Sequence, residues 1–213
     1  MADLEEKSRI ESAAMERFLE SGVYKVTLDE IAADLHVSKK TVYKFFPSKE
    51  DLLRAAVHMR MRRIEGSVAE IVASEKPFET KMTELLMVIG TLVRRLSRQF
   101  QLDIQRFAPN LWKEIDTFRR ERVFSRVKKM FHQAQDEKVF RQDMNIDLFF
   151  LIFISAIEGI MNPPVLSQQS FSAEEAFRGI FRLLFEGALT PEARLKFKAF
   201  DDTLQSDQYT RTI

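Results

Sequence analysis

The sequence predicts an all-α fold, and three observations support this prediction. The 213 residues include only six glycines and six prolines, and no alternating apolar and polar run of strand length occurs. Apolar residues recur instead at steps of three and four, which is the period of an amphipathic helix. The prolines fall between these periodic segments and mark the breaks between helices, at Pro47, Pro77, Pro109, Pro163–Pro164 and Pro191.

The sequence pattern of the N-terminal region predicts three short helices. Residues 7–19 form the first, whose apolar positions share one face and which Gly22 ends. The second starts at Thr27, because its hydroxyl can accept from a free backbone amide while Glu30 stands three positions on, the pattern of a capping box. The third starts at Ser38 and ends before the next proline.

The remaining helices are longer. A fourth opens at residue 48, and its apolar stripe continues to residue 71. The next has an apolar side over 82–100, a shorter helix ends near Pro109, and a long charged helix covers 111–138. Two strongly apolar helices follow over 147–161 and 172–189, and the second of these opens with another capping box.

Charge and composition exclude several classes of protein. The 33 Lys and Arg nearly balance the 32 Asp and Glu, so binding to a polyanion requires a local cluster of charge. The absence of cysteine excludes disulfide scaffolds, thiolate metal sites and thiol catalysis. The histidines His36, His58 and His132 are far apart and lack metal-pair spacing. We therefore expect no metal and no cofactor.

The N-terminus and the apolar segments predict a cytoplasmic protein. Acidic residues near the start and the lack of an uninterrupted apolar stretch argue against a secretory signal. The most apolar run covers residues 148–157, whereas a membrane span needs about 20 residues. We expect this run to be a buried helix, and we expect no membrane association.

Residues 27–49 carry the strongest functional signal. A helix of about eight residues, a tight turn and a second short helix have the spacing of a helix-turn-helix. Between Ser38 and Lys49 there is no acid and there are four lysines, namely Lys39, Lys40, Lys44 and Lys49. The hydroxyls of Ser38, Thr41 and Tyr43 can donate to phosphates. A solvated basic surface is the alternative, but the coincidence with the helix-turn-helix spacing favours DNA binding.

The segment TLDEIAADLHVSKKTVYKFFPSKEDLL resembles the DNA-binding segment of the TetR family of bacterial transcriptional regulators, and the resemblance covers about the first 55 residues. It implies that phosphates are held by Thr27, Thr41, Tyr43 and Lys49. It implies that base edges or neighbouring phosphates are met by Lys39, Lys40 and Lys44. Two positions depart from the family pattern: His36 replaces the usual turn glycine, and Phe45 replaces a His or Tyr, so no phosphate hydrogen bond is expected there.

The resemblance also implies the domain plan. Residues 1–55 form a helix-turn-helix DNA-binding domain, which a long helix joins to a helical effector-binding and dimerisation domain over 56–213. The tail from about residue 191 alternates charges with few anchors and is expected to be frayed. The expected partners are a double-stranded DNA operator, a second copy of the chain and a small effector.

The two most apolar helices are the predicted dimer interface, because they carry more large apolar residues than one monomer face can hide. The candidates are Phe149, Phe153, Phe177, Ile180, Phe181 and Leu184. The alternative is that both are core helices of a monomer.

An effector pocket is expected among aromatic and methionine residues near the helix breaks between Met82 and Met130. The candidates are Met87, Phe100, Phe107, Trp112 and Phe118. Their chemistry suits an apolar or aromatic effector, although an aromatic stripe can equally be ordinary core.

Together these patterns predict a ligand-responsive, sequence-specific DNA-binding regulator, a repressor released from a pseudo-palindromic operator by an apolar small molecule. The alternative is an architectural or constitutive DNA-binding protein without an effector. An enzyme is not expected, because the sequence lacks a nucleophile–base pair, a phosphate-binding glycine loop and metal-ligand spacing.

Overall fold

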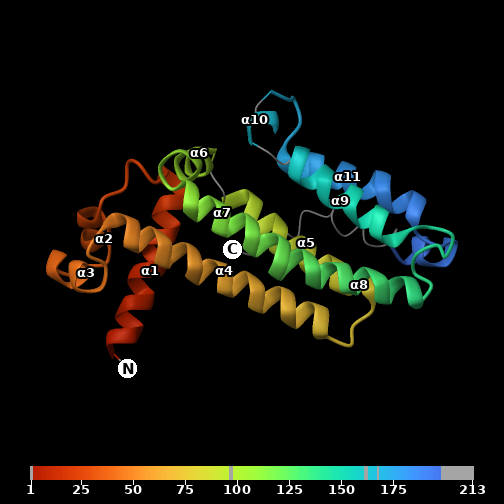
Figure 1. Ribbon diagram of the computed structural model, residues 1–213, viewed down its shortest axis with the longest axis horizontal. Helices are drawn as coiled ribbons and strands as arrows, with labels where there is room; N and C mark the ends of the chain where they lie inside the picture. Colours follow the sequence, from red (N-terminus) through yellow and green to blue (C-terminus); the bar gives the residue numbers. More distant parts are fainter. Residues whose placement is uncertain (1, 96–97, 161–162, 167, 198–213) are drawn as a thin grey trace. The chain divides into compact units, whose positions relative to one another are not determined.

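The computed structural model confirms the all-α prediction (Figure 1). It describes residues 2–95, 98–160, 163–166 and 168–197. Within these ranges the only β-type pairing is an isolated bridge between Phe140 and Leu189, and no helix is long and apolar enough to cross a membrane. The helices are α1 (Ala2–Ser21), α2 (Leu28–Asp34), α3 (Lys39–Phe45), α4 (Lys49–Ala73), α5 (Phe78–Arg95), α6 (Arg98–Phe107), α7 (Pro109–Phe118), the π-helix η1 (Arg119–Phe124), α8 (Ser125–Asp136), α9 (Ile146–Ile160), α10 (Pro163–Leu166) and α11 (Ala173–Ala188).

Local sequence signals start two of these helices as predicted. The side chain of Thr27 accepts from the backbone N–H of Glu30 at 3.2 Å, which completes the capping box of α2. Ser172 accepts in the same way from Glu175 at 3.1 Å, at the start of α11. The turn after α2 places His36 at a φ of 55°, so a left-handed backbone conformation does occur where the family has glycine.

Two predicted helices differ from the observed ones. The single helix expected over 111–138 contains a six-residue π-helix, Arg119–Phe124, between α7 and α8. A π-helical turn lies inside a continuous helical backbone, so the apolar period did not reveal it. In addition, α5 ends at Arg95, and Phe100 therefore belongs to α6 and not to the helix before it.

The end of the chain corrects the predicted frayed tail, because residues 191–197 are helical. Phe197 is buried, and its ring centroid lies 6.0 Å from that of Phe78 and 6.1 Å from that of Phe181. Pro191 is the first residue of this helical segment, and a proline suits this position because the N–H that it lacks would have no intrahelical partner there. The rest of the predicted tail, residues 198–213, lies outside the described residues.

The chain forms two compact units. The first combines Met1–Ser67 with Thr91–Val123, and the second combines Val68–Gly90 with Phe124–Ile213. The helices α4 and α5 contribute residues to both units. The predicted boundary after residue 55 lies inside α4 and inside the first unit, and it stays a prediction about function.

The first unit has one core, to which α1, α2, α3, α6 and α7 all contribute. Phe18 of α1, Ile31 of α2 and Val42 of α3 have no exposed surface. Phe100 and Ile104 of α6 are buried in the same cluster. Full burial of one such side chain stabilises a protein by about 1.5–3 kcal/mol. The first three helices therefore rest on α6 through a shared apolar contact.

The second unit is built around phenylalanine. The fully buried ring of Phe131, on α8, has other rings at centroid distances between 5.3 and 6.0 Å, namely those of Phe78, Phe140, Phe149, Phe150, Phe153 and Phe185. Helix α9 packs against both α8 and α11. Offset and edge-on ring pairs of this kind each add about 0.5–1.5 kcal/mol beyond area burial.

Candidate DNA-binding interface

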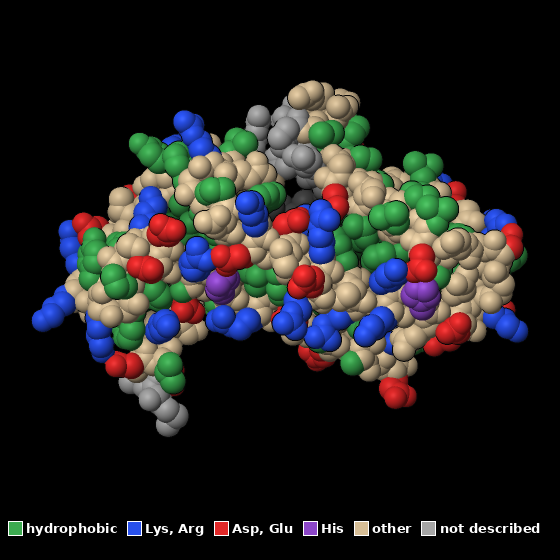
Figure 2. Space-filling view, in the orientation of Figure 1, with side chains coloured by type: hydrophobic (Ala, Val, Ile, Leu, Met, Phe, Trp, Pro, Cys, Tyr) green, Lys and Arg blue, Asp and Glu red, His purple; other side chains and the backbone are tan. Residues whose placement is uncertain are grey.

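One face of α3 is available for DNA contacts. Val42 and Phe46 are buried in the core of the first unit, so the opposite side of the helix faces solvent. That side carries Lys39, Lys40, Tyr43 and Lys44, all of them exposed. Blue Lys and Arg side chains project around the α2–α3 region, at the left of Figure 2. The structure therefore brings together the side chains expected to meet the bases.

Three of the predicted phosphate-binding hydroxyls, those of Thr27, Ser38 and Thr41, lie at helix starts, where each also has a partner within the chain. Ser38 Oγ accepts from the backbone N–H of Thr41 at 3.0 Å and lies 2.8 Å from Thr41 Oγ1. Thr27 Oγ1 lies 2.9 Å from Glu30 Oε2, to which it donates. Hydrogen bonds from the Thr27 backbone and hydroxyl lower the pKa of Glu30. These bonds hold the hydroxyls at fixed positions next to the lysine face.

Two lysines of α3 are paired with carboxylates of the same chain. Lys39 Nζ lies 2.5 Å from Asp29 Oδ2 on α2, and this hydrogen bond raises the pKa of Lys39. Lys44 Nζ lies 2.8 Å from Asp3 Oδ2 on α1. Among the described residues, no carboxylate lies within ion-pair distance of Lys40. Neither pairing was predicted from the sequence, because both acids lie outside the basic segment. The acidic first turns of α1 and α2 were the available signal.

Lys49 lies in the first turn of α4, where free backbone amides and the helix dipole favour an anion. Ser48 begins this turn, and its Oγ accepts from the backbone N–H of Asp51 at 3.1 Å. The Nζ of Lys49 donates to the carbonyl oxygen of Tyr24 at 3.0 Å, and partial burial lowers the pKa of Lys49. The position agrees with a phosphate contact, and the Tyr24 bond is a feature that the sequence did not predict.

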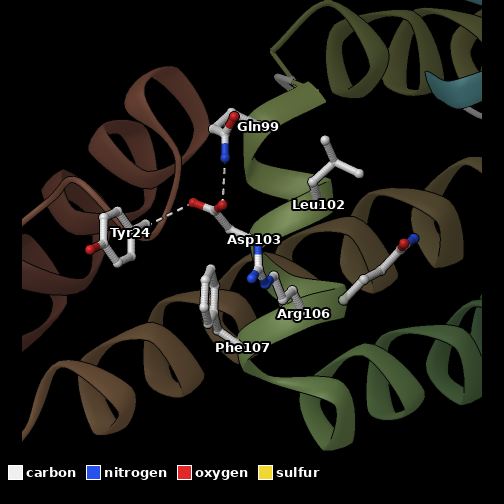
Figure 3. Close-up of a pocket in the computed structure, with 7 residues that line it drawn as sticks. Tyr24, Gln99, Leu102, Asp103, Arg106 and Phe107 are labelled. Atoms are coloured by element: carbon white, nitrogen blue, oxygen red, sulfur yellow. Dashed lines mark hydrogen bonds between the residues drawn. The ribbon is translucent and has the colours of Figure 1, made fainter.

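An open depression of about 770 Å³ lies between α6 and Tyr24, which belongs to the loop that joins α1 and α2 (Figure 3). Its lining is Tyr24, Gln99, Leu102, Asp103, Gln105, Arg106 and Phe107. Asp103 is 3% exposed, although it is charged. The Tyr24 ring stacks on that of Phe107 at a centroid distance of 5.7 Å. Of these residues only Phe107 was predicted from the sequence. The signal for Asp103 was an acid among the apolar residues of α6.

The five effector-pocket candidates are distributed over different environments. Phe100 is buried and Trp112 is partly buried against the core of the first unit. Phe107 is 52% exposed at the surface depression, and Phe118 is half-buried. Met87 belongs to the second unit and is exposed. Phe100 and Trp112 thus belong to the helix-turn-helix core, and an effector site among the five stays a prediction.

Most of the predicted dimer residues lie inside the chain's own core. Phe149, Phe153, Ile180 and Phe181 are buried, while Phe177 and Leu184 are half-buried. The exposed apolar side chains of the same helices are their neighbours, namely Leu148, Leu151 and Ile152 on α9 and Leu183 on α11. The period of α9 did not reveal which of its sides is buried, because most of its residues are apolar. A dimer interface at the six predicted residues stays a prediction.

The helix-turn-helix segment is similar to segments of known proteins. The family model described as bacterial regulatory proteins of the tetR family matches residues 10–56. The uncharacterized HTH-type transcriptional regulator YvaF of Bacillus subtilis (strain 168) is 25% identical over 179 residues, which cover 83% of this chain and 92% of that protein.

Solved structures extend the likeness over most of the chain. The fatty acid degradation regulator FadR from Bacillus halodurans aligns with a TM-score of 0.63 at 18% identity, covering 85% of this chain and 95% of that one. A gamma-butyrolactone receptor, described as ArpA-like, aligns with a TM-score of 0.65 at 17% identity, covering 96% and 98%. At such identities the likeness concerns the fold, while the matched segment runs from α1 into α4 and contains the lysine face of α3. Residues 10–56 thus match the helix-turn-helix segment of the TetR family, and most of the chain is similar to a bacterial HTH-type transcriptional regulator.

Proposed function

We propose that this regulator is a homodimeric repressor that leaves a pseudo-palindromic operator when it binds a small apolar molecule. The observation that carries the DNA-binding part is the lysine face of α3, held outward by buried Val42 and Phe46. Lys49 and Thr27, at the starts of α4 and α2, flank that face and are assigned to phosphates. Such a protein acts on chromosomal DNA, so we place it in the bacterial cytoplasm.

Base readout is assigned to Lys40 first, because its ammonium group has no carboxylate within ion-pair distance among the described residues. Lys39 and Lys44 form ion pairs with Asp29 and Asp3, and each must break its ion pair before its ammonium group can donate to DNA. Lysine can donate to guanine O6 and N7 in the major groove, with less directional preference than the arginine fork. We therefore expect operator recognition to combine a few lysine–base contacts with a larger phosphate term.

The proposed dimer interface is the exposed face of α9 and α11. Leu148, Leu151 and Ile152 are 54%, 62% and 46% exposed and follow each other at helical spacing. Leu183, on α11, is 79% exposed. Exposed large apolar residues on two helices that pack together suit an interaction site, and a two-fold axis would pair that site with itself. The buried phenylalanines behind it would give this interface a rigid support.

A two-fold dimer presents two copies of α3 to the DNA. Helix-turn-helix dimers read two half-sites about 34–36 Å apart, so the operator mirrors the symmetry of the protein. An effector acts on this arrangement only through its different affinity for the DNA-competent and DNA-incompetent states, with couplings of about 1–3 kcal/mol. The predicted pocket residues are aromatic or methionine, and this chemistry supports an apolar or aromatic effector.

The experiment has two stages. The protein is first used to select DNA from a random library, and sequencing of the retained DNA should return a pseudo-palindrome with half-sites about one helical turn apart. Small molecules that raise the thermal unfolding temperature are then titrated against the selected operator. Apolar hits should weaken operator binding by about 5- to 150-fold. If no palindrome emerges, or if the hits leave operator affinity unchanged, a constitutive or architectural DNA-binding role replaces the repressor proposal.

A further inference from the structure

We infer that Asp103, on α6, is a positioning residue for DNA binding: through the backbone of Tyr24 it holds Lys49 in place to meet a phosphate. This inference rests on the proposed function, because it takes from it the assignment of Lys49 to phosphate. Asp103 lies far from the helix-turn-helix in sequence, and its side chain is buried.

The carboxylate of Asp103 is almost fully buried and bonded on both oxygens. Oδ2 accepts from the backbone N–H of Tyr24 at 2.7 Å, and Oδ1 accepts from Gln99 Nε2 at 2.5 Å. Figure 3 shows Asp103 between these two partners. A buried carboxylate is costly unless such bonds compensate it, so its presence at 3% exposure indicates that the loop is anchored to α6 at this point.

The loop between α1 and α2 fits closely against the same helix. Gly22 has a φ of +81°, which L side chains rarely adopt. A Cβ at this position would lie 2.5 Å from Gln99 Cγ and 2.8 Å from Asp103 Oδ2. The backbone therefore approaches α6 at a distance that only glycine permits. The bond from Tyr24 to Asp103 is thus part of a tight contact and not an isolated surface interaction.

The backbone carbonyl of Tyr24 faces α4. Its carbonyl oxygen accepts from Lys49 Nζ at 3.0 Å, so the one residue links α6 to the start of α4. A lysine ammonium has three N–H donors, and the bond to Tyr24 leaves the others for a phosphate. Because a free lysine side chain loses rotamer entropy on binding, one that is already held loses less. The structure thus prepares Lys49 for its contact.

A double-mutant cycle tests this link. Asp103→Ala, Asp103→Asn, Lys49→Ala and the double variant Asp103→Ala/Lys49→Ala are compared with the wild type. The probe is a DNA duplex of mixed sequence, titrated over a series of KCl concentrations. Asp103→Ala should weaken binding by about two- to tenfold for each bound protomer, because Lys49 is no longer held. Asp103→Asn should restore most of the affinity, since its amide oxygen can still accept from Tyr24.

The decisive measurement is the effect of Asp103→Ala on DNA affinity in a protein that already carries Lys49→Ala. If Asp103 acts through Lys49, adding Asp103→Ala to Lys49→Ala should cause no further loss. A full additional loss there would overturn the inference and show that Asp103 supports the helix-turn-helix as a whole. If Lys49→Ala itself left affinity and salt slope unchanged, the phosphate assignment in the proposed function would fail instead, which separates the two failures.

Folding is checked by thermal unfolding of every variant. Gln105→Ala is the matched control, because Gln105 is an exposed residue of the same helix and lines the same depression; it should bind DNA as the wild type does. Should Asp103→Ala not fold, Asp103→Ser takes its place in the cycle, because its hydroxyl reaches one atom less far toward the Tyr24 amide. An Asp103→Asn variant that binds as weakly as Asp103→Ala would also contradict the inference.

Discussion

Asp3 in the first turn of α1 and Lys44 in the last turn of α3 form an ion pair, with Oδ2 and Nζ 2.8 Å apart. The pair places a carboxylate on the face of α3 that is proposed to meet DNA. Both side chains are more than half exposed, and an ion pair of this kind adds little to folding stability. Its effect is on binding, because Asp3 and a DNA phosphate compete for the same ammonium group.

Asp3→Asn should therefore tighten DNA binding without changing stability. At low salt we expect an increase in affinity of about two- to fivefold for a mixed-sequence duplex, which shrinks as salt screens the carboxylate. Fluorescence anisotropy at several KCl concentrations measures it. Glu5→Gln removes the same charge from the same helical turn and is the control. Equal gains from both variants would show a general charge effect and no specific role for the Lys44 pair.

Lys49→Ala and Lys40→Ala should change DNA binding in different ways. Loss of one phosphate contact lowers the salt slope by about one for each protomer and weakens all sequences alike. Loss of a base contact changes which bases are preferred at one position of each half-site, by about 1–3 kcal/mol. Selection from a random library combined with salt titration separates the two. A changed base preference in Lys49→Ala with an unaltered slope would contradict these roles.

Gly22→Ala should destabilise the protein, and Gly66→Ala should not. The first substitution introduces a side chain at a φ of +81° and at 2.5 Å from Gln99 Cγ, with a cost of at least about 1–3 kcal/mol. Gly66 lies within α4 with no atom within 4 Å of its added Cβ, so alanine should stabilise it by about 0.5–1 kcal/mol. Urea unfolding measures both. Equal stabilities for the two variants would contradict the close approach of the loop to α6.

Stability in acid should depend on Glu114, on α7. A hydrogen bond to His58, followed by one to Arg54, lowers the pKa of Glu114 below its ordinary value of 4.5. A carboxyl whose pKa is lower in the folded state stabilises the fold fully above the unfolded value, and this contribution is lost as pH falls through the folded value. Unfolding of the wild type and Glu114→Gln should therefore converge as pH is lowered from about 6 to 3. A constant difference across that range would show that the carboxylate charge has no part.

Leu183→Glu should dissociate the proposed dimer and leave the protomer folded. Leu183 is 79% exposed in the chain, so a charge there costs little until a partner covers it. We expect the dimer dissociation constant to rise more than tenfold, as for loss of a central interface contact of about 2 kcal/mol. Sedimentation and circular dichroism measure assembly and folding. Phe181→Glu is the contrast, because Phe181 is buried and the charge should unfold the protomer itself. A wild type that sediments as a monomer at micromolar concentration contradicts the proposal.

The helix starts and the lysine face of α3 could be predicted from the sequence, because each depends on residues a few positions apart. The capping boxes of Thr27 and Ser172 involve only their own helical turns. The amphipathic period of residues 39–45 places Val42 inward and the lysines outward. Such signals depend only on residues within one or two helical turns, so they can be recognised in the sequence without knowledge of the tertiary structure.

The partners of those lysines were decided by the tertiary structure. Asp3 and Lys44 are 41 positions apart, and Asp103 and Tyr24 are 79 apart, so no local spacing predicts their hydrogen bonds. The same holds for the inner face of α9, where Phe149 is buried and Leu148 is exposed although both are large and apolar. Local periodicity identifies a helix, but only packing against other elements determines which of two apolar faces is covered and which charges meet.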